Sequence, residues 1–430
     1  MEVRVEKVEG IRGNVIAPPS KSYTHRAFII ASLAEGCSVI KNYLRAQDTL
    51  STLKACGAFG VRIEENDRVT IHGSGGKLQT PKGVIDCENS GTTMRLISGI
   101  AALDGEVTLT GDASIQRRPM QPLLDALKQL GVEVYSTKGD GTPPILMKGG
   151  NLKGGKVKIR GDISSQFISS LLILSPCVKD DVRITVTTPM KSKPYIDLTL
   201  DIMEKFGVKV ENKNYREFFI KAGQKYRGRE YEIEGDYSSA SYFLALAAMT
   251  HSEITVKNLF KETKQGDRKL LDILKKMGAE VAVRDREITV KGAKLQGIRA
   301  SLGDAPDLLP AVAALACKAK GKTVIKNVEH ARFKESDRIA ACSSELSKFG
   351  VDIEEKRDGL VIYGTGRLTG ARVNSVDKLG RADHRMAMAL AVAGLAAEGE
   401  TSIENAECVE ISFPDFFNIL RSLGIILSAP

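Results

Sequence analysis

The sequence predicts an α/β protein with two similar domains, each built from three copies of one repeated unit. Three patterns support this fold class: an amphipathic helix that ends at a glycine, a strand pair after that glycine, and a second helix that is apolar almost all round. Each pattern recurs six times along the 430 residues. With 42% hydrophobic residues, a chain of this length can bury two or three sizeable cores.

The amphipathic helices are recognised by their spacing. Leu124, Leu127 and Leu130 precede Gly131 by seven, four and one positions, which places the three leucines on one helical face. A glycine at this point is typical of a helix C-cap, where the backbone needs a positive φ. The same spacing occurs in six segments, whose glycines are 71 to 76 residues apart: 53–65, 123–134, 200–210, 271–281, 343–353 and 416–426.

A β-hairpin is expected after each of these glycines. Apolar residues alternate with polar ones, as in Val132 and Val134 after Gly131, and then come polar turn residues and a second apolar run. Alternation with period two is typical of a half-buried strand. Each unit should therefore contain about four strands as well as its two helices.

The second helix of each unit is expected to be buried, because it has no polar face. Its first turn is polar, however, and cations lie in or near such turns at Lys21, Arg95 and Arg385, among others. A cation near a helix start opposes the helix dipole unless an anion lies between them, so converging helix starts would form an anion-binding site. The buried helices are expected at 20–34, 90–103, 164–175, 238–249, 306–317 and 383–396.

The composition and the net charge argue against several classes of function. The net charge of +9 favours anionic partners, but aromatic residues make up only 5% and tryptophan is absent, which argues against nucleic-acid binding. The longest apolar stretch, 386–397, is too short to cross a bilayer, and the first ten residues lack the apolar block of a secretory signal. We therefore expect no membrane contact and a cytoplasmic location. The scattered Cys and His residues do not support a metal site.

Short polar motifs occur at the starts of the buried helices and in nearby loops. In the run Ser20-Lys21-Ser22 with the following Arg26, the side chains of Lys21, Ser22 and Arg26 share a helical face suited to a phosphate group. The further motifs are Asn89-Ser90-Gly91-Thr92-Thr93-Met94-Arg95, Gln116-Arg117-Arg118-Pro119-Met120, Ser164-Ser165-Gln166, Ser192-Lys193-Pro194-Tyr195-Ile196-Asp197, Pro306-Asp307, Lys334-Glu335-Ser336-Asp337-Arg338 and Asp383-His384-Arg385-Met386-Ala387-Met388. In order and spacing, these motifs resemble the site motifs of the 5-enolpyruvylshikimate-3-phosphate (EPSP) synthase family.

The resemblance implies the enolpyruvyl transferase-like fold, an inside-out α/β barrel in which each of two domains has three βαβαββ units. This agrees with the six repeats, which rest on periodicity alone. Domain I would comprise residues 1–18 and 234–430 and carry the phosphoenolpyruvate-binding and catalytic residues. Domain II, residues 19–233, would bind shikimate 3-phosphate. A hinge near the two crossovers between these domains predicts closure on substrate binding.

The implied reaction transfers the enolpyruvyl (carboxyvinyl) group of phosphoenolpyruvate to the 5-hydroxyl of shikimate 3-phosphate and releases phosphate, by addition and elimination. It belongs to the shikimate pathway, which leads through chorismate to the aromatic amino acids. Proton transfer in both steps requires carboxyl groups or similar acids and bases. By resemblance, Asp307 is the base for the hydroxyl, Glu335 is the acid and base at the methylene, and Lys21 neutralises the bridging phosphate oxygen. No cofactor is implied, and we expect a monomer.

The resemblance also assigns the binding residues. Guanidinium groups bind phosphate and carboxylate groups in a bidentate manner, so Arg118, Arg338 and Arg385 would clamp phosphoenolpyruvate. The residues expected to bind phosphoenolpyruvate are Lys21, Asn89, Gly91, Arg118, Gln166, Arg338 and Arg385. The residues expected to bind shikimate 3-phosphate are Lys21, Ser22, Arg26, Ser164, Ser165, Gln166, Ser192, Tyr195, Asp307 and Lys334.

Several of these residues also have a local explanation. Ser164 alone fits a helix cap, Asp307 fits an acid of a first helical turn, and Glu335 fits a partner for Arg338 at i, i+3. The shared order of the motifs favours the site over these separate explanations. Ile411 departs from the family pattern, since many bacterial members have a lysine there that contacts phosphoenolpyruvate. The other carboxylates near the motifs, Asp48, Asp236 and Asp337, are expected to be mainly structural or orienting.

Two other functions stay open. A sister enolpyruvyl transferase acts on UDP-N-acetylglucosamine, shares the fold and usually has a reactive cysteine in a mobile loop. The corresponding loop lies between Cys87 and Cys177, where no cysteine occurs. A non-catalytic anion or nucleic-acid binder on the same scaffold would not need Asp307 and Glu335, because carboxylates weaken anion binding unless they move protons.

Overall fold

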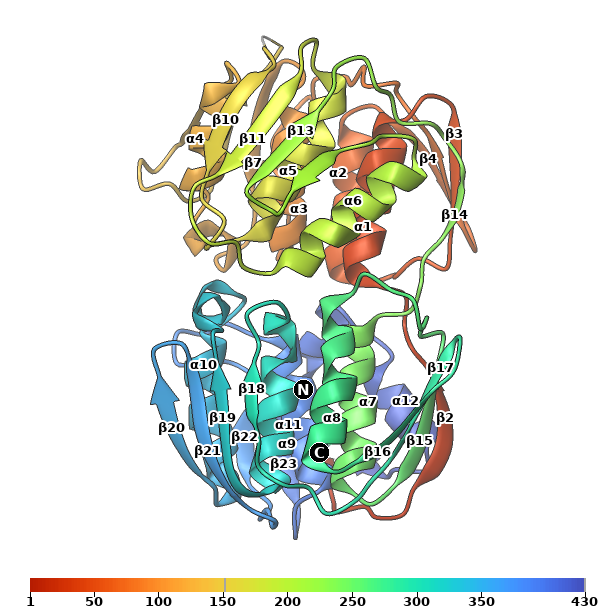
Figure 1. Cartoon of the computed structure of the whole chain (residues 1–430), viewed down its shortest axis with the longest axis vertical. Coiled ribbons are helices and arrows are strands. Elements are labelled where there is room, and N and C mark those ends of the chain that lie inside the picture. Colours follow the sequence, from red (N-terminus) through yellow and green to blue (C-terminus); the bar gives the residue numbers. More distant parts are fainter. Residues whose placement is uncertain (151, 429–430) are drawn as a thin grey trace. The chain divides into compact units, whose positions relative to one another are not determined.

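The computed structural model describes residues 1–150 and 152–428, which form two compact units. Unit 1 comprises Met1–Pro18 and Glu234–Pro430, and unit 2 comprises Pro19–Ile233. Each unit has its own cluster of buried apolar side chains. The strands of the described residues form six sheets of four strands each, as the six repeats predict (Figure 1).

The three sheets of unit 2 share one strand order. In each sheet, the first strand lies at an edge and runs parallel to the second. The second strand pairs antiparallel with the third, and the third pairs antiparallel with the fourth. The first sheet is β14 (Glu230–Glu232), β3 (Cys37–Lys41), β5 (Val69–His72) and β4 (Arg62–Glu65). The second is β6 (Ile85–Asp86), β7 (Glu106–Thr110), β9 (Ile145–Lys148) and β8 (Glu133–Ser136). The third is β10 (Gly155–Ile159), β11 (Val182–Val186), β13 (Glu217–Ile220) and β12 (Glu211–Lys213).

The three sheets of unit 1 repeat this order. The first is β2 (Arg12–Ile16), β15 (Glu253–Lys257), β17 (Glu287–Lys291) and β16 (Glu280–Val283). The second is β18 (Arg299–Ser301), β19 (Lys320–Lys326), β21 (Gly359–Thr365) and β20 (Asp352–Lys356). The third is β22 (Arg372–Asn374), β23 (Thr401–Glu404), β1 (Val3–Val5) and β24 (Leu427–Ser428).

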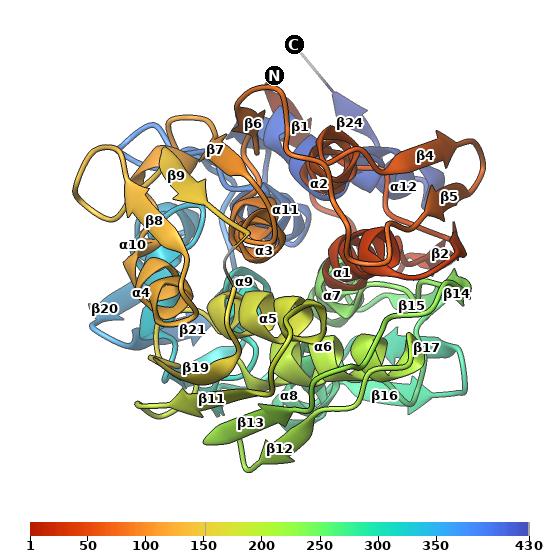
Figure 2. The same cartoon turned by 90° about the horizontal axis from the view of Figure 1, so that it is seen from above.

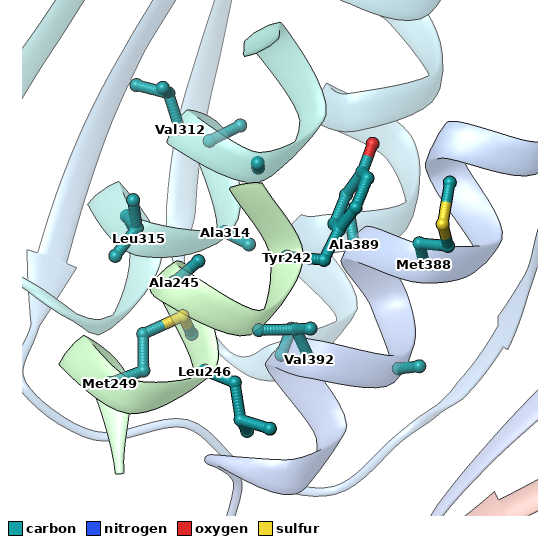
Figure 3. Close-up of a cluster of buried hydrophobic side chains, with 14 of the residues drawn as sticks. Tyr242, Ala245, Leu246, Met249, Val312, Ala314, Leu315, Met388, Ala389 and Val392 are labelled. Carbon is teal, nitrogen blue, oxygen red and sulfur yellow. The ribbon is translucent and has the colours of Figure 1, made fainter. Parts of the chain in front are cut away.

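The helices that are apolar almost all round are buried, as predicted. In unit 2 these are α1 (Lys21–Leu33), α3 (Gly91–Ala101) and α5 (Ser165–Leu174), which lie inside the ring of sheets in Figure 2. In unit 1 they are α7 (Tyr237–Met249), α9 (Leu309–Lys318) and α11 (His384–Leu395). Figure 3 shows how side chains of α7, α9 and α11 pack together: Tyr242, Ala245, Leu246, Met249, Val312, Ala314, Leu315, Met388, Ala389 and Val392.

The amphipathic helices and their glycine caps are also confirmed. They are α2 (Gln47–Ala58), α4 (Gln121–Gln129), α6 (Lys193–Lys205), α8 (Leu270–Met277), α10 (Arg338–Leu346) and α12 (Phe416–Ser422). The glycines that follow them, at positions 60, 131, 207, 278, 350 and 424, have φ values between 80° and 105°. Only glycine adopts this backbone conformation at little cost.

The expected β-hairpin is present in five repeats and wrong in the sixth. After Gly424 the strand β24 pairs antiparallel with β1, from the start of the chain, instead of with a strand that follows it. The first repeat of each unit likewise takes its parallel edge strand from a distant segment, β14 in unit 2 and β2 in unit 1. A periodic pattern predicts that a strand exists but does not say which chain segment completes its sheet.

Short 3₁₀ helices connect several of these elements. Three of them carry or adjoin polar motifs: η1 (Ile115–Arg117), η4 (Pro306–Leu308) and η5 (Glu329–Phe333). A further one, η3 (Gly266–Lys269), lies outside the motifs and contains the buried Asp267. Among the described helices, none is both long and apolar enough to span a membrane.

Candidate active site

Polar contacts join the first turns of four helices in unit 2. Nζ of Lys21, at the start of α1, lies 2.7 Å from Oδ2 of Asp48 in the first turn of α2. Oγ1 of Thr93, in the first turn of α3, donates a hydrogen bond of 3.4 Å to the backbone carbonyl of Asp48. Thr92 of α3 accepts a hydrogen bond of 2.9 Å from Nε2 of Gln166 in α5. The starts of α1, α2, α3 and α5 therefore lie at the same end of unit 2, where their dipoles favour an anion.

Asp48 holds Lys21 at this end of the unit. Its side chain is 5% exposed. Burial raises the pKa of Asp48, but the charges of Lys21 and His25 and the hydrogen bond from Lys21 outweigh burial, so the pKa lies below its usual value. The pairing of Asp48 with Lys21 has no sequence signal, because 27 residues separate them.

Arg118 lies against the first residue of α3. The side chain is 6% exposed, and Nη2 donates a hydrogen bond of 3.2 Å to Oγ of Ser114. A Cβ atom at Gly91 would lie 2.4 Å from Nη1 of Arg118, so only glycine leaves room for the guanidinium group there. Asn89, just before α3, donates a hydrogen bond of 2.6 Å to Oδ2 of Asp112. This places a buried guanidinium group beside the positive end of a helix dipole.

The amide group of Gln166 has a fixed orientation. Oε1 accepts a hydrogen bond of 2.7 Å from Nη1 of Arg95, and Nε2 donates to Oγ1 of Thr92. The guanidinium group of Arg95 lies over the ring of Phe167, 5.6 Å from its centre. Ser164 caps α5 by accepting a hydrogen bond of 3.3 Å from the backbone N–H of Gln166, so the helix-cap role expected for Ser164 is confirmed. Because α3 and α5 both contribute, neither helix can shift without disturbing Gln166.

Arg26 lies in the interior and braces two predicted binding segments. Its side chain is 1% exposed. Nε donates 2.8 Å to Oγ1 of Thr199, Nη1 donates 2.9 Å to the carbonyl of Ser22, and Nη2 donates 3.3 Å to the carbonyl of Tyr195. Burial lowers the pKa of Arg26 to about 10. Ser192, which precedes α6, has φ 55°, a left-handed conformation that is uncommon outside glycine.

In unit 1, the guanidinium group of Arg338 is the centre of a charged cluster. Nη1 lies 2.6 Å from Oδ1 of Asp307, Nη2 lies 2.5 Å from Oε2 of Glu335, and Nε lies 2.8 Å from Oδ2 of Asp383. Burial lowers the pKa of Arg338, but the charges of Asp383, Glu335 and Asp307 raise it well above its usual value. Glu335 thus pairs with Arg338 at i, i+3, as a purely local role of Glu335 would require. The pair does not lie on the surface, however, because the side chain of Arg338 is 1% exposed.

Two further cations approach Asp307, which precedes α9. Nζ of Lys334 lies 3.5 Å from Oδ1 of Asp307, and Nη2 of Arg385 lies 3.3 Å from Oδ2. Nη1 of Arg385 donates a hydrogen bond of 2.5 Å to Oγ of Ser238, in the first turn of α7. Asp307 therefore lies among the charged ends of residues from α10, α11 and the loop between η5 and α10.

Asp383 is fully buried and joins α10 to α11. It caps α11 by accepting a hydrogen bond of 3.0 Å from the backbone N–H of Arg385, and Oγ of Ser336 donates 2.9 Å to its Oδ2. Burial raises the pKa of Asp383, but the charge of Arg338 outweighs burial and the pKa lies below its usual value. A buried carboxylate of this kind depends on its cation, because an unpaired buried charge is strongly unfavourable.

Asp267 in η3 is a further buried carboxyl group of unit 1, 5% exposed. Burial raises its pKa from 3.8 to about 7, and the charges of Asp307 and Asp236 act in the same direction. The charge of Arg385 and the hydroxyl of Ser238 oppose this shift. The sequence motifs include neither Asp267 nor Ser238, and only the position of Ser238 at a helix start could have marked it.

The predicted site residues fall into two groups, one in each unit. Unit 2 contains Lys21, Ser22, Arg26, Asn89, Gly91, Arg118, Ser164, Ser165, Gln166, Ser192 and Tyr195. Unit 1 contains Asp307, Lys334, Glu335, Arg338 and Arg385, which lie in one connected cluster. Among residues 1–150 and 152–428, no group of three or more His, Cys, Asp or Glu side chains is placed to hold a metal ion.

Comparison with known proteins identifies the family. The family model described as EPSP synthase (3-phosphoshikimate 1-carboxyvinyltransferase) matches residues 5–420. The 3-phosphoshikimate 1-carboxyvinyltransferase of Methanococcus vannielii is 51% identical over 427 residues, which cover 98% of both chains. That of Methanocaldococcus jannaschii is 51% identical over 426 residues, or 98% of this chain and 97% of the relative.

Solved structures confirm the predicted fold class. An EPSP synthase from Acinetobacter baumannii matches with a TM-score of 0.84 and 30% identity, and the match covers 100% of both chains. The six sheets, the two units and the helix starts with their charged residues thus occur in a chain that is similar to EPSP synthases over its full length. The chain belongs to the EPSP synthase family, the 3-phosphoshikimate 1-carboxyvinyltransferases.

Proposed function

We propose that this chain transfers the enolpyruvyl group of phosphoenolpyruvate to the 5-hydroxyl of shikimate 3-phosphate, giving 5-enolpyruvylshikimate 3-phosphate and phosphate. This is the reaction of the family to which it belongs, a step of the shikimate pathway toward chorismate and the aromatic amino acids. The observation that carries the proposal is the cluster around Arg338, where one buried guanidinium group holds Asp307 and Glu335 at 2.6 and 2.5 Å.

The reaction needs a base and an acid in each of its two steps. In the addition, the 5-hydroxyl oxygen bonds to C2 of phosphoenolpyruvate, the hydroxyl proton passes to a base, and an acid protonates the methylene carbon. In the elimination, a base removes a proton from the new methyl group, the double bond forms again, and the C2–O bond to phosphate breaks. Asp307 would accept the hydroxyl proton, and Glu335 would give and then take back the proton at the methylene carbon.

The cations of both units would bind the anionic groups of the substrates. Arg338 and Arg385 in unit 1 and Arg118 in unit 2 suit the phosphate and carboxylate of phosphoenolpyruvate, because a guanidinium group donates two parallel hydrogen bonds. Lys21, held by Asp48, would neutralise the bridging phosphate oxygen as it leaves, and Lys334 would add a point charge. Asn89, Gly91 and Gln166 complete the proposed phosphoenolpyruvate set.

The proposed contacts of shikimate 3-phosphate come mostly from unit 2. Hydroxyl, amide and cationic groups at the starts of α1, α5 and α6 would bind its ring and phosphate: Lys21, Ser22, Arg26, Ser164, Ser165, Gln166, Ser192 and Tyr195. Asp307 and Lys334 would complete this set from unit 1. Arg26 is buried against Ser22 and Tyr195, so its contribution would be to hold these segments as well as to add charge.

The test is phosphate release from phosphoenolpyruvate by the purified protein, with and without shikimate 3-phosphate. We expect release only with shikimate 3-phosphate, and a loss of at least about a hundredfold in kcat for Glu335→Ala, the usual size of a general acid or base contribution. Glu280→Ala is the matched control, because Glu280 is an exposed glutamate of β16 in the same unit.

The same assay distinguishes the other functions. Release with UDP-N-acetylglucosamine but not with shikimate 3-phosphate would favour the sister transferase, and no release with either acceptor would favour a binding protein. Neither alternative is favoured by the family match. The monomeric state, the cytoplasmic location and the absence of nucleic-acid binding stay predictions, which sedimentation, cell fractionation and heparin retention would test.

A further inference from the structure

A row of buried polar side chains joins three helices just below the helix starts of unit 2. Nδ1 of His25, in α1, lies 2.7 Å from Oγ1 of Thr52 in α2. Oγ1 of Thr52 lies 2.6 Å from Oγ1 of Thr93 in α3. Oγ1 of Thr93 in turn lies 2.6 Å from Oγ of Ser90, which caps α3. All four residues are at most 1% exposed, so they depend on one another for hydrogen bonds.

This row lies directly behind residues that form the site. His25 follows Lys21 by four residues in α1, or about one helical turn. Thr52 follows Asp48 by the same interval in α2, and Asp48 holds Lys21 in an ion pair of 2.7 Å. The hydroxyl of Thr93 also reaches the backbone carbonyl of Asp48, at 3.4 Å. A shift of α1, α2 or α3 against the other two helices would therefore break a buried contact of the row.

The chemistry of the row gives its hydrogen bonds a direction. Burial lowers the pKa of His25 to about 3, against the charge of Asp48, so the imidazole is neutral and carries one N–H. Nε2 of His25 is buried and has no hydrogen-bond partner among the described residues. A buried N–H without an acceptor is rarer than a buried acceptor without a donor, so the proton belongs on Nδ1, where Thr52 accepts it. Thr52 then donates to Thr93, and Thr93 donates to Ser90.

We propose that His25, Thr52 and Thr93 are positioning residues, whose one-way chain of hydrogen bonds sets how the starts of α1, α2 and α3 meet. This rests on the proposed function, in which Lys21 and Gly91, at the starts of α1 and α3, bind phosphoenolpyruvate. The three residues are fully buried, so they act through their helices and do not touch the substrate. A satisfied polar network of this kind makes a core rigid, and this one adds no charge that would repel an anion or compete with it.

The first test locates the imidazole proton of His25. In protein with isotope-labelled histidine, nitrogen NMR shows which ring nitrogen carries the proton, and His25→Asn identifies the signal of His25 among the five histidines. We expect a proton on Nδ1 and none on Nε2. A ring that is protonated at Nε2 would reverse the chain and overturn the proposal. If His25→Asn does not fold, the kinetic test decides alone.

The kinetic test compares Thr52→Val, which resembles threonine in shape but interrupts the chain, with Thr52→Ser, which keeps the hydroxyl. Thr52→Val should raise the KM for phosphoenolpyruvate about fivefold, the size of one ordinary hydrogen bond. The KM for shikimate 3-phosphate should rise less, because most of its proposed binding residues lie outside α2 and α3. Thr52→Ser should restore the KM of wild type. If Thr52→Val leaves both KM values unchanged or raises them equally, as a purely structural residue would, the proposal is wrong.

Ser98→Ala is the matched control. Ser98 is a fully buried residue of α3 outside the row, and its hydroxyl donates a hydrogen bond of 2.6 Å to the carbonyl of Met94 in the same helix. Its loss should therefore leave both KM values unchanged, which separates the loss of any buried hydroxyl in this core from an interruption of the chain.

Two further measurements keep this result separate from other failures. If Thr52→Val does not fold, Thr93→Val takes its place, and an unchanged KM for phosphoenolpyruvate overturns the proposal. If the wild type releases no phosphate, the proposed function fails instead. The variants are then compared by thermal shift with inorganic phosphate. A smaller stabilisation of Thr52→Val than of Thr52→Ser supports the positioning role, and an equal stabilisation overturns it.

Discussion

Glycine at position 91 gives Arg118 its place in the site. The guanidinium group occupies the volume that a side chain at the start of α3 would fill, since a Cβ there would lie 2.4 Å from Nη1. The nearest atoms to such a Cβ all belong to Arg118, so a substitution would act on this side chain and on little else.

Gly91→Ala should therefore raise the KM for phosphoenolpyruvate about tenfold, equivalent to about 1.4 kcal/mol of binding. The KM for shikimate 3-phosphate and the thermal midpoint should change little, because Arg118 can move as a flexible side chain. Steady-state kinetics with each substrate varied in turn measures this. An equal rise in both KM values would mean that α3 itself has shifted.

Asp267 also predicts how stability depends on pH. Its pKa is raised on folding from 3.8 to about 7, so the folded state binds a proton more tightly than the unfolded state between these pH values. The free energy of unfolding should therefore fall as the pH rises from about 4 to about 7, by up to a few kcal/mol.

Asp267→Asn cannot ionise and lacks this contribution. Its stability relative to wild type should increase between pH 4.5 and pH 7.5, as measured by urea denaturation at both pH values. Comparing the two proteins cancels the contributions of all other titrating groups. A stability difference that is independent of pH would show that Asp267 titrates normally.

At the scale of the elements, the six glycine caps are positions where the sequence determines local structure directly. Gly207 after α6 has φ 92°, and a Cβ there would meet no atom closer than 3.7 Å. The need for glycine at this position is therefore conformational and does not arise from crowding. Gly57, near the end of α2, differs: it is exposed, its φ is not positive, and a Cβ at this position would have no atom within 4 Å.

Alanine at these two positions should have opposite effects. Gly207→Ala should destabilise unit 2 by about 1 kcal/mol, because alanine resists the left-handed conformation. Gly57→Ala should stabilise it by up to about 1 kcal/mol through helix propensity. Urea denaturation of both variants tests the pair, and a loss of stability in both would contradict the assignment of Gly57 to the body of a helix.

Most of the fold could be predicted from period and composition, since helices and strands of a repeat follow from local patterns. The sixth hairpin could not, because β1 and β24 come from opposite ends of the chain. The motifs identified Asp307, Glu335 and Arg338 as site residues. They did not predict that Arg338 would pair with both of these carboxylates and with Asp383 as a third. Asp267 and Ser238 were missed because their importance comes from burial and from neighbours distant in sequence.

At the scale of the whole molecule, two units with separate cores carry separate groups of site residues. Most of the residues proposed for shikimate 3-phosphate belong to unit 2. Shikimate 3-phosphate alone should therefore slow amide exchange first and most strongly at the starts of α1, α5 and α6, since ligand binding suppresses local opening.

Hydrogen–deuterium exchange with peptide resolution measures this effect. Shikimate without its phosphate group serves as the control ligand and should protect the same helix starts less. Protection confined to unit 1 would contradict the assignment of the shikimate 3-phosphate residues.

The course of the chain has a consequence for protein engineering. Unit 2 is a continuous segment inserted into unit 1, and the backbone N–H of Asp236 donates a hydrogen bond of 2.7 Å to the carbonyl of Pro18. The two ends left by excising unit 2 are therefore already adjacent. A short linker from Pro18 to Glu234 would keep β1 and β2 in their sheets and yield unit 1 as a single shortened chain, in which the Arg338 cluster can be titrated without the residues of unit 2.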